Sequence, residues 1–262
     1  MSMYKKTPYR ISTMTVIANW GVSIDRNILF DQLKPIIIPL WYPDEGILKY
    51  EHNNIYYGNS YKDVFTNRKI PKKSFFNQST IIVRRLVDNR WKEINIKLFE
   101  NGGIQMTGIS SKEFAENTIY WLADIFSQLP KNPFMGKIPD IKNVSIPLIN
   151  TDFSIGSNID QEVLHSILVD KYNLISILEK TIYQGINTKY FFNSKTSDGI
   201  CHCIEKCKGA GNSDNECKKI TVSIFRTGKI IITGAKTINQ INTVYDFINN
   251  IIERHYDEIV VT

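Results

Sequence analysis

The chain has 262 residues, of which 42% are hydrophobic, 22% charged and 11% aromatic. A chain of this length and composition can bury a large core, which excludes a largely disordered protein. It contains no run of 18 apolar residues that would indicate a membrane span, and Met1–Pro8 lacks the apolar segment of a signal peptide, so we expect an intracellular protein. The net charge of +6 is compatible with a nucleic-acid partner, although charge alone favours the simpler interpretation of solubility.

The sequence contains an internal repeat. Residues 94–110 align without a gap with residues 220–236, at an offset of 126, and 6 of the 17 positions are identical. The identical pairs are Ile94/Ile220, Phe99/Phe225, Gly102/Gly228, Ile104/Ile230, Thr107/Thr233 and Gly108/Gly234. We interpret this match as a duplication of one structural unit.

Each half of the chain predicts the same order of elements: a strand, a helix, several antiparallel strands and a second helix. The repeated segment itself predicts a β-hairpin, because alternating apolar residues lead into a short Gly-containing turn. Ser110 or Ser111 is the expected N-cap of the helix that follows in the first half, and Thr237 has this role in the second half. The other predicted elements are strands near 10–18 and 141–148 and helices near 25–33 and 160–170.

These elements predict an α+β protein in which two repeats, residues 1–130 and 131–262, together form one structural domain. The polar, Tyr-rich segment 41–76 is interpreted as an insertion in the first repeat. The Cys-rich segment 196–219 is interpreted as an insertion in the second repeat.

Within this duplicated unit, residues 225–236 read Phe-x-x-Gly-Lys-x-x-x-Thr-Gly-Ala-Lys, which resembles the TATA-binding protein family. The first half keeps Phe99, Gly102, Thr107 and Gly108 of the same motif. The richness in Ile, Asn and Lys and the insertions are similar to those of the divergent relatives carried by large DNA viruses.

The resemblance implies a pseudo-twofold antiparallel β-saddle with helices on its convex face and the minor groove of DNA against its concave face. The minor groove presents A·T pairs only as acceptors, so a wide apolar face with few polar groups distinguishes A·T from G·C. Phenylalanine side chains that wedge between base steps kink the duplex, and the larger wrapped surface offsets the cost of unstacking.

The resemblance also assigns roles to individual residues of this chain. It implies two wedge phenylalanines, two threonines that contact bases, one asparagine that donates to bases and two lysines beside phosphates: Phe99 and Phe225, Thr107 and Thr233, Asn143, and Lys229 and Lys236. Simpler interpretations stay open, namely hairpin core for the phenylalanines, β-propensity for the threonines, a turn for the asparagine and solvated charge for the lysines.

The first half departs from the family pattern. Ser12 stands where the family has its other asparagine, and Gly103 and Ser110 stand where lysines are expected. Glu100 places an acid near the path of a phosphate backbone. For the second wedge residue of each repeat, the spacing leaves Phe75 or Phe76 and Phe191 or Phe192 as candidates.

All four cysteines, Cys201, Cys203, Cys207 and Cys217, lie within 17 residues of sequence. Disulfides are rare in the cytosol, so two states remain: reduced thiols, or four thiolates around a structural zinc ion. The Cys-x-Cys pair departs from the commoner Cys-x-x-Cys ligand pair, although residues two apart in a strand share one face. The family resemblance requires no cofactor.

No catalytic motif is present in the sequence, so we do not expect an enzyme. The predicted function is that of a divergent TATA-binding-like transcription initiation factor. Its expected partners are double-stranded A+T-rich DNA, a TFIIB-like factor and RNA polymerase, with no membrane. If the chain is viral, its expected location is a cytoplasmic replication site or the virion, and otherwise the nucleus. The alternative is a saddle-shaped interaction scaffold that no longer binds DNA in a sequence-specific way.

Overall fold

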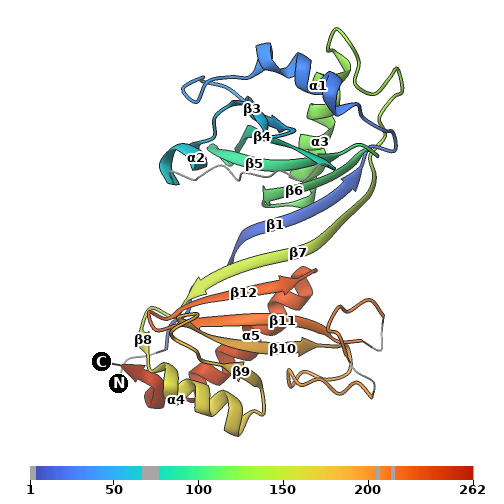
Figure 1. Cartoon of the computed structure of the whole chain (residues 1–262). Helices are drawn as coiled ribbons and strands as arrows, with labels where there is room; N and C mark the ends of the chain where they lie inside the picture. Colours follow the sequence, from blue (N-terminus) through green and yellow to red (C-terminus); the bar gives the residue numbers. More distant parts are fainter. Residues whose placement is uncertain (1–3, 67–76, 205–206, 214–215, 262) are drawn as a thin grey trace. The chain divides into compact units, whose positions relative to one another are not determined.

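The computed structural model describes residues 4–66, 77–204, 207–213 and 216–261 and divides the chain into two compact units (Figure 1). The N-terminal unit comprises Thr13–Pro147, and the C-terminal unit comprises Met1–Ser12 and Leu148–Thr262. The units differ from the expected repeats at residues 1–12 and 131–147. The chain passes from one unit to the other within strands β1 (Arg10–Asn19) and β7 (Lys142–Ser154).

The N-terminal unit is an antiparallel sheet with the strand order β3-β2-β4-β5-β6-β1. Its remaining strands are β2 (Gly46–His52), β3 (Ile55–Gly58), β4 (Gln78–Val87), β5 (Arg90–Phe99) and β6 (Gly103–Ile109). Its helices are α1 (Arg26–Leu33), the 3-10 turn η1 (Lys34–Ile36), α2 (Tyr61–Thr66) and α3 (Lys112–Ser127). The segment expected as an insertion contributes β2, β3 and α2, and its residues 67–76 lie outside the described part of the chain.

The C-terminal unit is an antiparallel sheet with the strand order β7-β12-β11-β10-β9. Its strands are β9 (Ile175–Ile177), β10 (Gly185–Phe192), β11 (Lys218–Phe225) and β12 (Lys229–Ala235), with a small separate pair of β8 (Asn158–Ile159) and β13 (Val260–Val261). Its helices are α4 (Gln161–Ser166), the π-helical turn η2 (Ile167–Lys171), α5 (Ile238–Arg254) and α6 (Tyr256–Ile259). The expected α+β class with antiparallel strands and helices is therefore confirmed.

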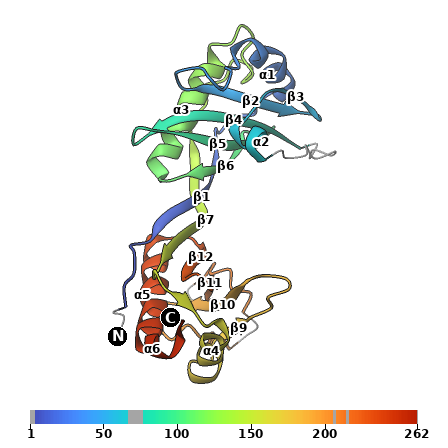
Figure 2. The same ribbon diagram turned by 90° about the vertical axis from the view of Figure 1, so that its left-hand side faces the viewer.

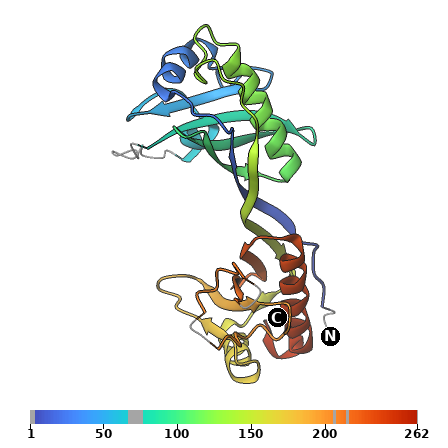
Figure 3. The same ribbon diagram turned by 90° about the vertical axis from the view of Figure 1, so that its right-hand side faces the viewer.

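One side of each sheet is buried beneath a long helix. In Figure 3, α3 (green) lies along the strands of its unit, and α5 (red) does the same in the other unit. The buried side chains alternate with less buried ones along the strands, as in Ile94, Ile96 and Leu98 of β5. Each helix begins at the expected cap: Ser111 accepts a hydrogen bond from the Phe114 amide, and Thr237 accepts one from the Gln240 amide.

Aromatic side chains fill both cores. In the N-terminal unit, the fully buried Trp20 meets the rings of Phe126 and Phe134 edge to face, at centroid distances of 5.7 and 5.2 Å. In the C-terminal unit, Phe153 of β7 packs against Tyr245 of α5 at 4.7 Å. No helix among the described residues is both long and apolar enough to cross a bilayer.

The two hairpins turn in the same way. The Gly102 amide donates to the Phe99 carbonyl, and the Gly228 amide donates to the Phe225 carbonyl, at 3.0 and 2.9 Å. Both glycines have left-handed backbone, with φ of +80° and +71°, which L side chains seldom adopt. A Cβ on Gly228 would stand 2.2 Å from the Ser157 carbonyl oxygen, so the turn needs glycine for space as well as for conformation.

This turn gives a test of the fold. We expect Gly228→Ala to lower the free energy of unfolding by more than about 2 kcal/mol, because it adds a steric clash to the cost of left-handed backbone. Gly156→Ala is the matched control, since Gly156 has φ +70° and a Cβ added there would have nothing within 4 Å. It should cost about 1 kcal/mol, the conformational part alone. Urea titrations followed by circular dichroism measure both, and equal losses would show that the clash is absent.

Candidate nucleic-acid interface

We call the side of each sheet that faces away from the long helix the open face. In β11, Val222 and Ile224 are buried on the helix side, whereas Thr221 and Phe225 lie on the open face. The strand register places Thr233 of β12 directly opposite Thr221. The motif residues of the C-terminal unit are therefore brought to one surface by the pleat of the strands.

Phe225 is half-buried on this face, at the end of β11. Its ring meets the ring of Tyr183 edge to face at a centroid distance of 5.6 Å, and Tyr183 keeps 41% of its surface exposed. Gly185 lies directly opposite Phe225 in β10, so there is no side chain to cover the ring from that strand. A cleft of about 580 Å³ opens beside it, lined by Gln161, Lys180, Gln184, Phe225, Arg226, Thr227, Lys229 and Ile231.

The cleft carries three cationic side chains. Arg226 and Lys229 are exposed on either side of the β11–β12 turn. Lys180 is held by Glu162, with Nζ 2.8 Å from Oε1. Cations beside an aromatic ring suit a DNA duplex, because the cations can contact phosphates while the ring inserts between base steps.

Lys189 adds a further cation near the middle of the open face. Its Nζ donates to Thr221 Oγ1 at 2.9 Å. Burial, together with the charge of nearby Lys219, lowers the pKa of Lys189 below the usual value for lysine. Two lysines held close to each other on one strand pair define a positive patch that favours an anionic partner.

Lys236 is used differently from the other motif lysine. Its Nζ donates to the Ala210 carbonyl at 2.9 Å and to Asn212 Oδ1 at 3.2 Å, both in the loop between β10 and β11. Lys229, by contrast, is exposed on the open face. Lys236 therefore binds the loop, whereas Lys229 faces solvent.

The N-terminal unit places its motif residues in the same way. Phe99 ends β5 on the open face, half-buried, and Thr107 of β6 lies opposite Asn95 of β5. Gln78 of β4 lies opposite Phe99, where the C-terminal unit has a glycine. The uncovered polar and apolar side chains of this face thus run across β5, β6 and β1.

Part of the open face of the N-terminal unit is covered by the segment around α2, which lies on the opposite side of the sheet from α1 and α3 (Figures 1 and 2). Lys49 of β2 forms an ion pair with Asp63 of α2 at 2.7 Å. The Tyr61 amide at the start of α2 donates to Glu93 of β5 at 2.6 Å. The uncovered area is therefore narrower in this unit than the sheet itself.

A second segment adds to this cover. The guanidinium of Arg84, only 2% exposed, donates to the carbonyls of Leu40, Tyr42 and Asp44. Because Arg84 lies opposite Glu93 in the β4–β5 pair, it is on the open face, and it holds the chain around residues 40–44 there. Several hydrogen bonds to one buried cation make this attachment strong.

The two open faces differ in charge. At positions related by the repeat, the N-terminal unit has Glu93, Glu100, Gly103 and Ser110 where the C-terminal unit has Lys219, Arg226, Lys229 and Lys236. Glu100 is 81% exposed and lies 3.8 Å from Arg26. At these four repeat-related positions, the C-terminal unit is therefore the more cationic.

Asn143 lies at the second residue of β7, exposed and in the N-terminal unit. Its backbone is left-handed, with φ +55°, a conformation that asparagine tolerates better than most residues. Ser12, its expected counterpart, donates to the Asn150 carbonyl at 3.1 Å. The base-reading role of Asn143 stays a prediction.

Sequence reasoning missed Tyr183 as the ring that accompanies Phe225. Of the suggested second wedge residues, Phe191 lies on the open face opposite Lys219 and Phe192 lies opposite Lys218. The candidates of the first repeat, Phe75 and Phe76, fall outside the described residues. Only the strand register shows that Gly185 faces Phe225 and that the chain just before it returns to that ring. No spacing in the sequence carries this information.

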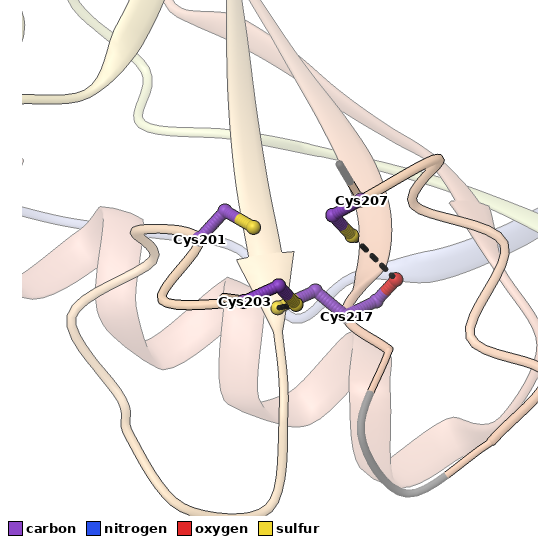
Figure 4. Close-up of side chains that lie close together, drawn as sticks. All are labelled: Cys201, Cys203, Cys207 and Cys217. Atoms are coloured by element: carbon purple, nitrogen blue, oxygen red, sulfur yellow. Dashed lines mark hydrogen bonds between the residues drawn. The ribbon is translucent and has the colours of Figure 1, made fainter. Parts of the chain in front are cut away.

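The four cysteines meet in the loop between β10 and β11, all as reduced thiols (Figure 4). Their sulfur atoms lie within 4.8 Å of one another. Burial, with the neighbouring thiols, raises the pKa of Cys217 to about 12, whereas hydrogen bonds from Cys217 lower the pKa of Cys203. His202 turns to Asp198, with Nε2 2.7 Å from Oδ2, instead of joining the cluster.

Two comparisons of the sequence with known proteins agree with the sequence motif. Residues 212–255 match the family "Transcription factor TFIID (or TATA-binding protein, TBP)". A "TATA-box-binding protein-like" protein of Acanthamoeba polyphaga mimivirus is 30% identical over 266 residues, which cover 95% of this chain and 66% of that protein. The solved structure of Methanococcus jannaschii TBP is similar with a TM-score of 0.48 and 14% identity, over 95% of this chain and 99% of that one.

The chain belongs to the TATA-binding protein family, with a relative in a large DNA virus. The family is one of transcription factors. The chain spans about two thirds of the length of its mimivirus relative, which is therefore the longer protein.

Proposed function

We propose that this protein is a TATA-binding-like transcription initiation factor that binds A+T-rich DNA through the minor groove. The observation that carries the proposal is that Phe99 and Phe225 end equivalent strands on the open face of their units, with Thr107 and Thr233 on the same faces. Family membership supports the class of function. The recruited partners would be a TFIIB-like factor and RNA polymerase, as the family resemblance implies.

The matching turns support the inference that the two units are repeats of one another. Besides the two glycine turns, the Ile24 amide donates to the Glu100 carbonyl, and the Ile159 amide donates to the Arg226 carbonyl. One residue later in each unit, an aspartate caps the following helix. These matching hydrogen bonds and helix caps support equivalent roles for Phe99 and Phe225.

Binding to DNA is tested by fluorescence anisotropy with two duplexes of equal length, one A+T-rich with a TATA sequence and one G·C-rich. We expect the A+T-rich duplex to bind at least about tenfold more tightly at physiological salt, because the G·C minor groove carries an additional amino group. Equal affinity for the two duplexes would contradict minor-groove reading. Absence of binding to either duplex would favour the alternative function, a protein-interaction scaffold. The partial cover of the N-terminal open face is compatible with that alternative.

The aromatic pair of the C-terminal unit gives a sharper test. Phe225→Ala should weaken binding to the A+T-rich duplex by about 1–3 kcal/mol and reduce DNA bending, because the wedge ring is lost. Tyr183→Ala should act in the same direction, and Tyr183→Phe should retain binding because the ring contact remains. Bending is measured by energy transfer between dyes at the duplex ends.

Tyr120→Ala is the matched control for these variants. Tyr120 is an aromatic residue of α3 with 57% of its surface exposed, and α3 lies on the helix side of its sheet. Its removal should change neither affinity nor bending. If Phe225→Ala binds and bends DNA as the unaltered protein does, the wedge role is wrong, and if it unfolds the protein, the ring belongs to the core.

The exposed position of Lys229 on the open face predicts a phosphate contact. Lys229→Gln should reduce the slope of log affinity against log salt by about 1, as expected for one lost phosphate contact. Lys112→Gln, which removes an exposed lysine at the start of α3, is the control and should leave the slope unchanged. If Lys229→Gln leaves the slope unchanged, this lysine makes no phosphate contact in the complex.

A further inference from the structure

The loop between β10 and β11 gathers its four thiols around one point. In Figure 4, Cys201 and Cys203 approach from one stretch of the loop, and Cys207 and Cys217 from two others. Four thiolates at about 2.3 Å from a tetrahedral Zn²⁺ ion lie about 3.8 Å from one another. The observed separations, all within 4.8 Å and 3.5 Å between Cys203 and Cys217, match this geometry.

Pairwise disulfide chemistry explains the cluster less well. One disulfide would use two of the sulfur atoms and would leave the convergence of the other two without a cause. A zinc ion uses all four sulfur atoms at once. It also explains why these side chains point inward although Cys201, Cys203 and Cys207 are only half-buried.

The loop is held by polar contacts and not by the burial of its apolar residue Ile204. Ile204, an apolar residue between the cysteines, is fully exposed, so the loop does not bury it in a core of its own. Its described contacts with the rest of the unit are polar: the Lys219 amide donates to the Gly209 carbonyl at 2.9 Å, the Phe191 amide donates to the Gly199 carbonyl, and Lys236 Nζ donates to the Ala210 carbonyl. Long loops without regular structure seldom hold one conformation unless a ligand or a metal fixes them.

Donors already point at the sulfur atoms. The Gly209 amide lies 3.3 Å from Cys207 Sγ, and Asn193 Nδ2 lies 3.7 Å from Cys217 Sγ. Hydrogen bonds to coordinating sulfur stabilise its negative charge, as neighbouring donors commonly do in metal sites. His202 is not a competing ligand, because its ring is bound to Asp198.

We propose that Cys201, Cys203, Cys207 and Cys217 bind one structural Zn²⁺ ion as four thiolates. Binding releases four protons, one from each thiol, and leaves the site with a net charge of −2. The cation of Lys236, which follows β12, donates to the Ala210 carbonyl of this loop and so brings a positive charge to it. The ion would thereby fix the loop against the first residues of β11.

The test measures metal and thiols in the full chain, produced with zinc and purified under reducing conditions without chelator. We expect about one zinc ion per chain by inductively coupled plasma mass spectrometry. The thiols should react slowly with Ellman's reagent until a chelator removes the ion. Substitution with Co²⁺ should give the strong visible absorption of a tetrahedral thiolate site.

Variants distinguish specific binding from adventitious metal. Cys217→Ser should reduce the zinc content at least about tenfold after dialysis against a competing chelator. His202→Ala is the matched control, because it removes a metal-binding side chain within the same segment, and it should keep the full zinc content. Zinc lost equally from both variants, or zinc absent from the unaltered chain with its four thiols reactive or oxidised to disulfides, would overturn the proposal.

Metal removal should also loosen the loop. Hydrogen exchange followed by mass spectrometry should show faster exchange within 193–217 after chelation, with little change in α3 of the other unit. If chelation leaves exchange in this loop unchanged, the ion does not order it and the structural role is wrong. These readouts involve no nucleic acid, so their outcome is independent of the outcome of the DNA-binding experiments.

Discussion

The structure depends on the one-sided burial of its antiparallel sheets. Side chains alternate across each strand, and a long helix covers one side, so that side carries the core and leaves the other free for function. Ile94, Ile96 and Leu98 are fully buried in β5, and Phe99 comes to the other face only because it is one residue further on. A shift of one residue in register would bury the motif side chains and expose the core.

The open faces of the two units differ in their side chains and in how much of each face is covered. The C-terminal unit keeps an aromatic pair beside a cleft rimmed by Arg226 and Lys229. The N-terminal unit has lost the equivalent cations and has part of its face covered by α2, held through Lys49 and Glu93. If the protein binds DNA as proposed, Arg226 and Lys229 would supply phosphate contacts that Glu100 and Gly103 cannot, because phosphate contacts supply much of the affinity of such complexes.

The Cys-rich loop, which joins β10 and β11, belongs to the C-terminal unit. Lys236, which the family motif places beside a phosphate, is instead engaged by the loop through Ala210 and Asn212. A loop fixed by metal would therefore replace one phosphate contact with a structural one. Lys208 of the loop and Lys219 of β11 are both exposed, so positive charge remains at this end of the unit.

The sequence by itself determined the class of fold, the hairpins and the helix caps, because strand alternation, turn glycines and capping residues act over a few neighbouring positions. It also determined the family, through the motif that ends at Lys236. Only the tertiary structure decided that Tyr183 accompanies Phe225 and that the segment carrying α2 lies over the open face. These contacts join residues far apart in the chain, and strand register and side-chain burial, which no local pattern encodes, bring them together.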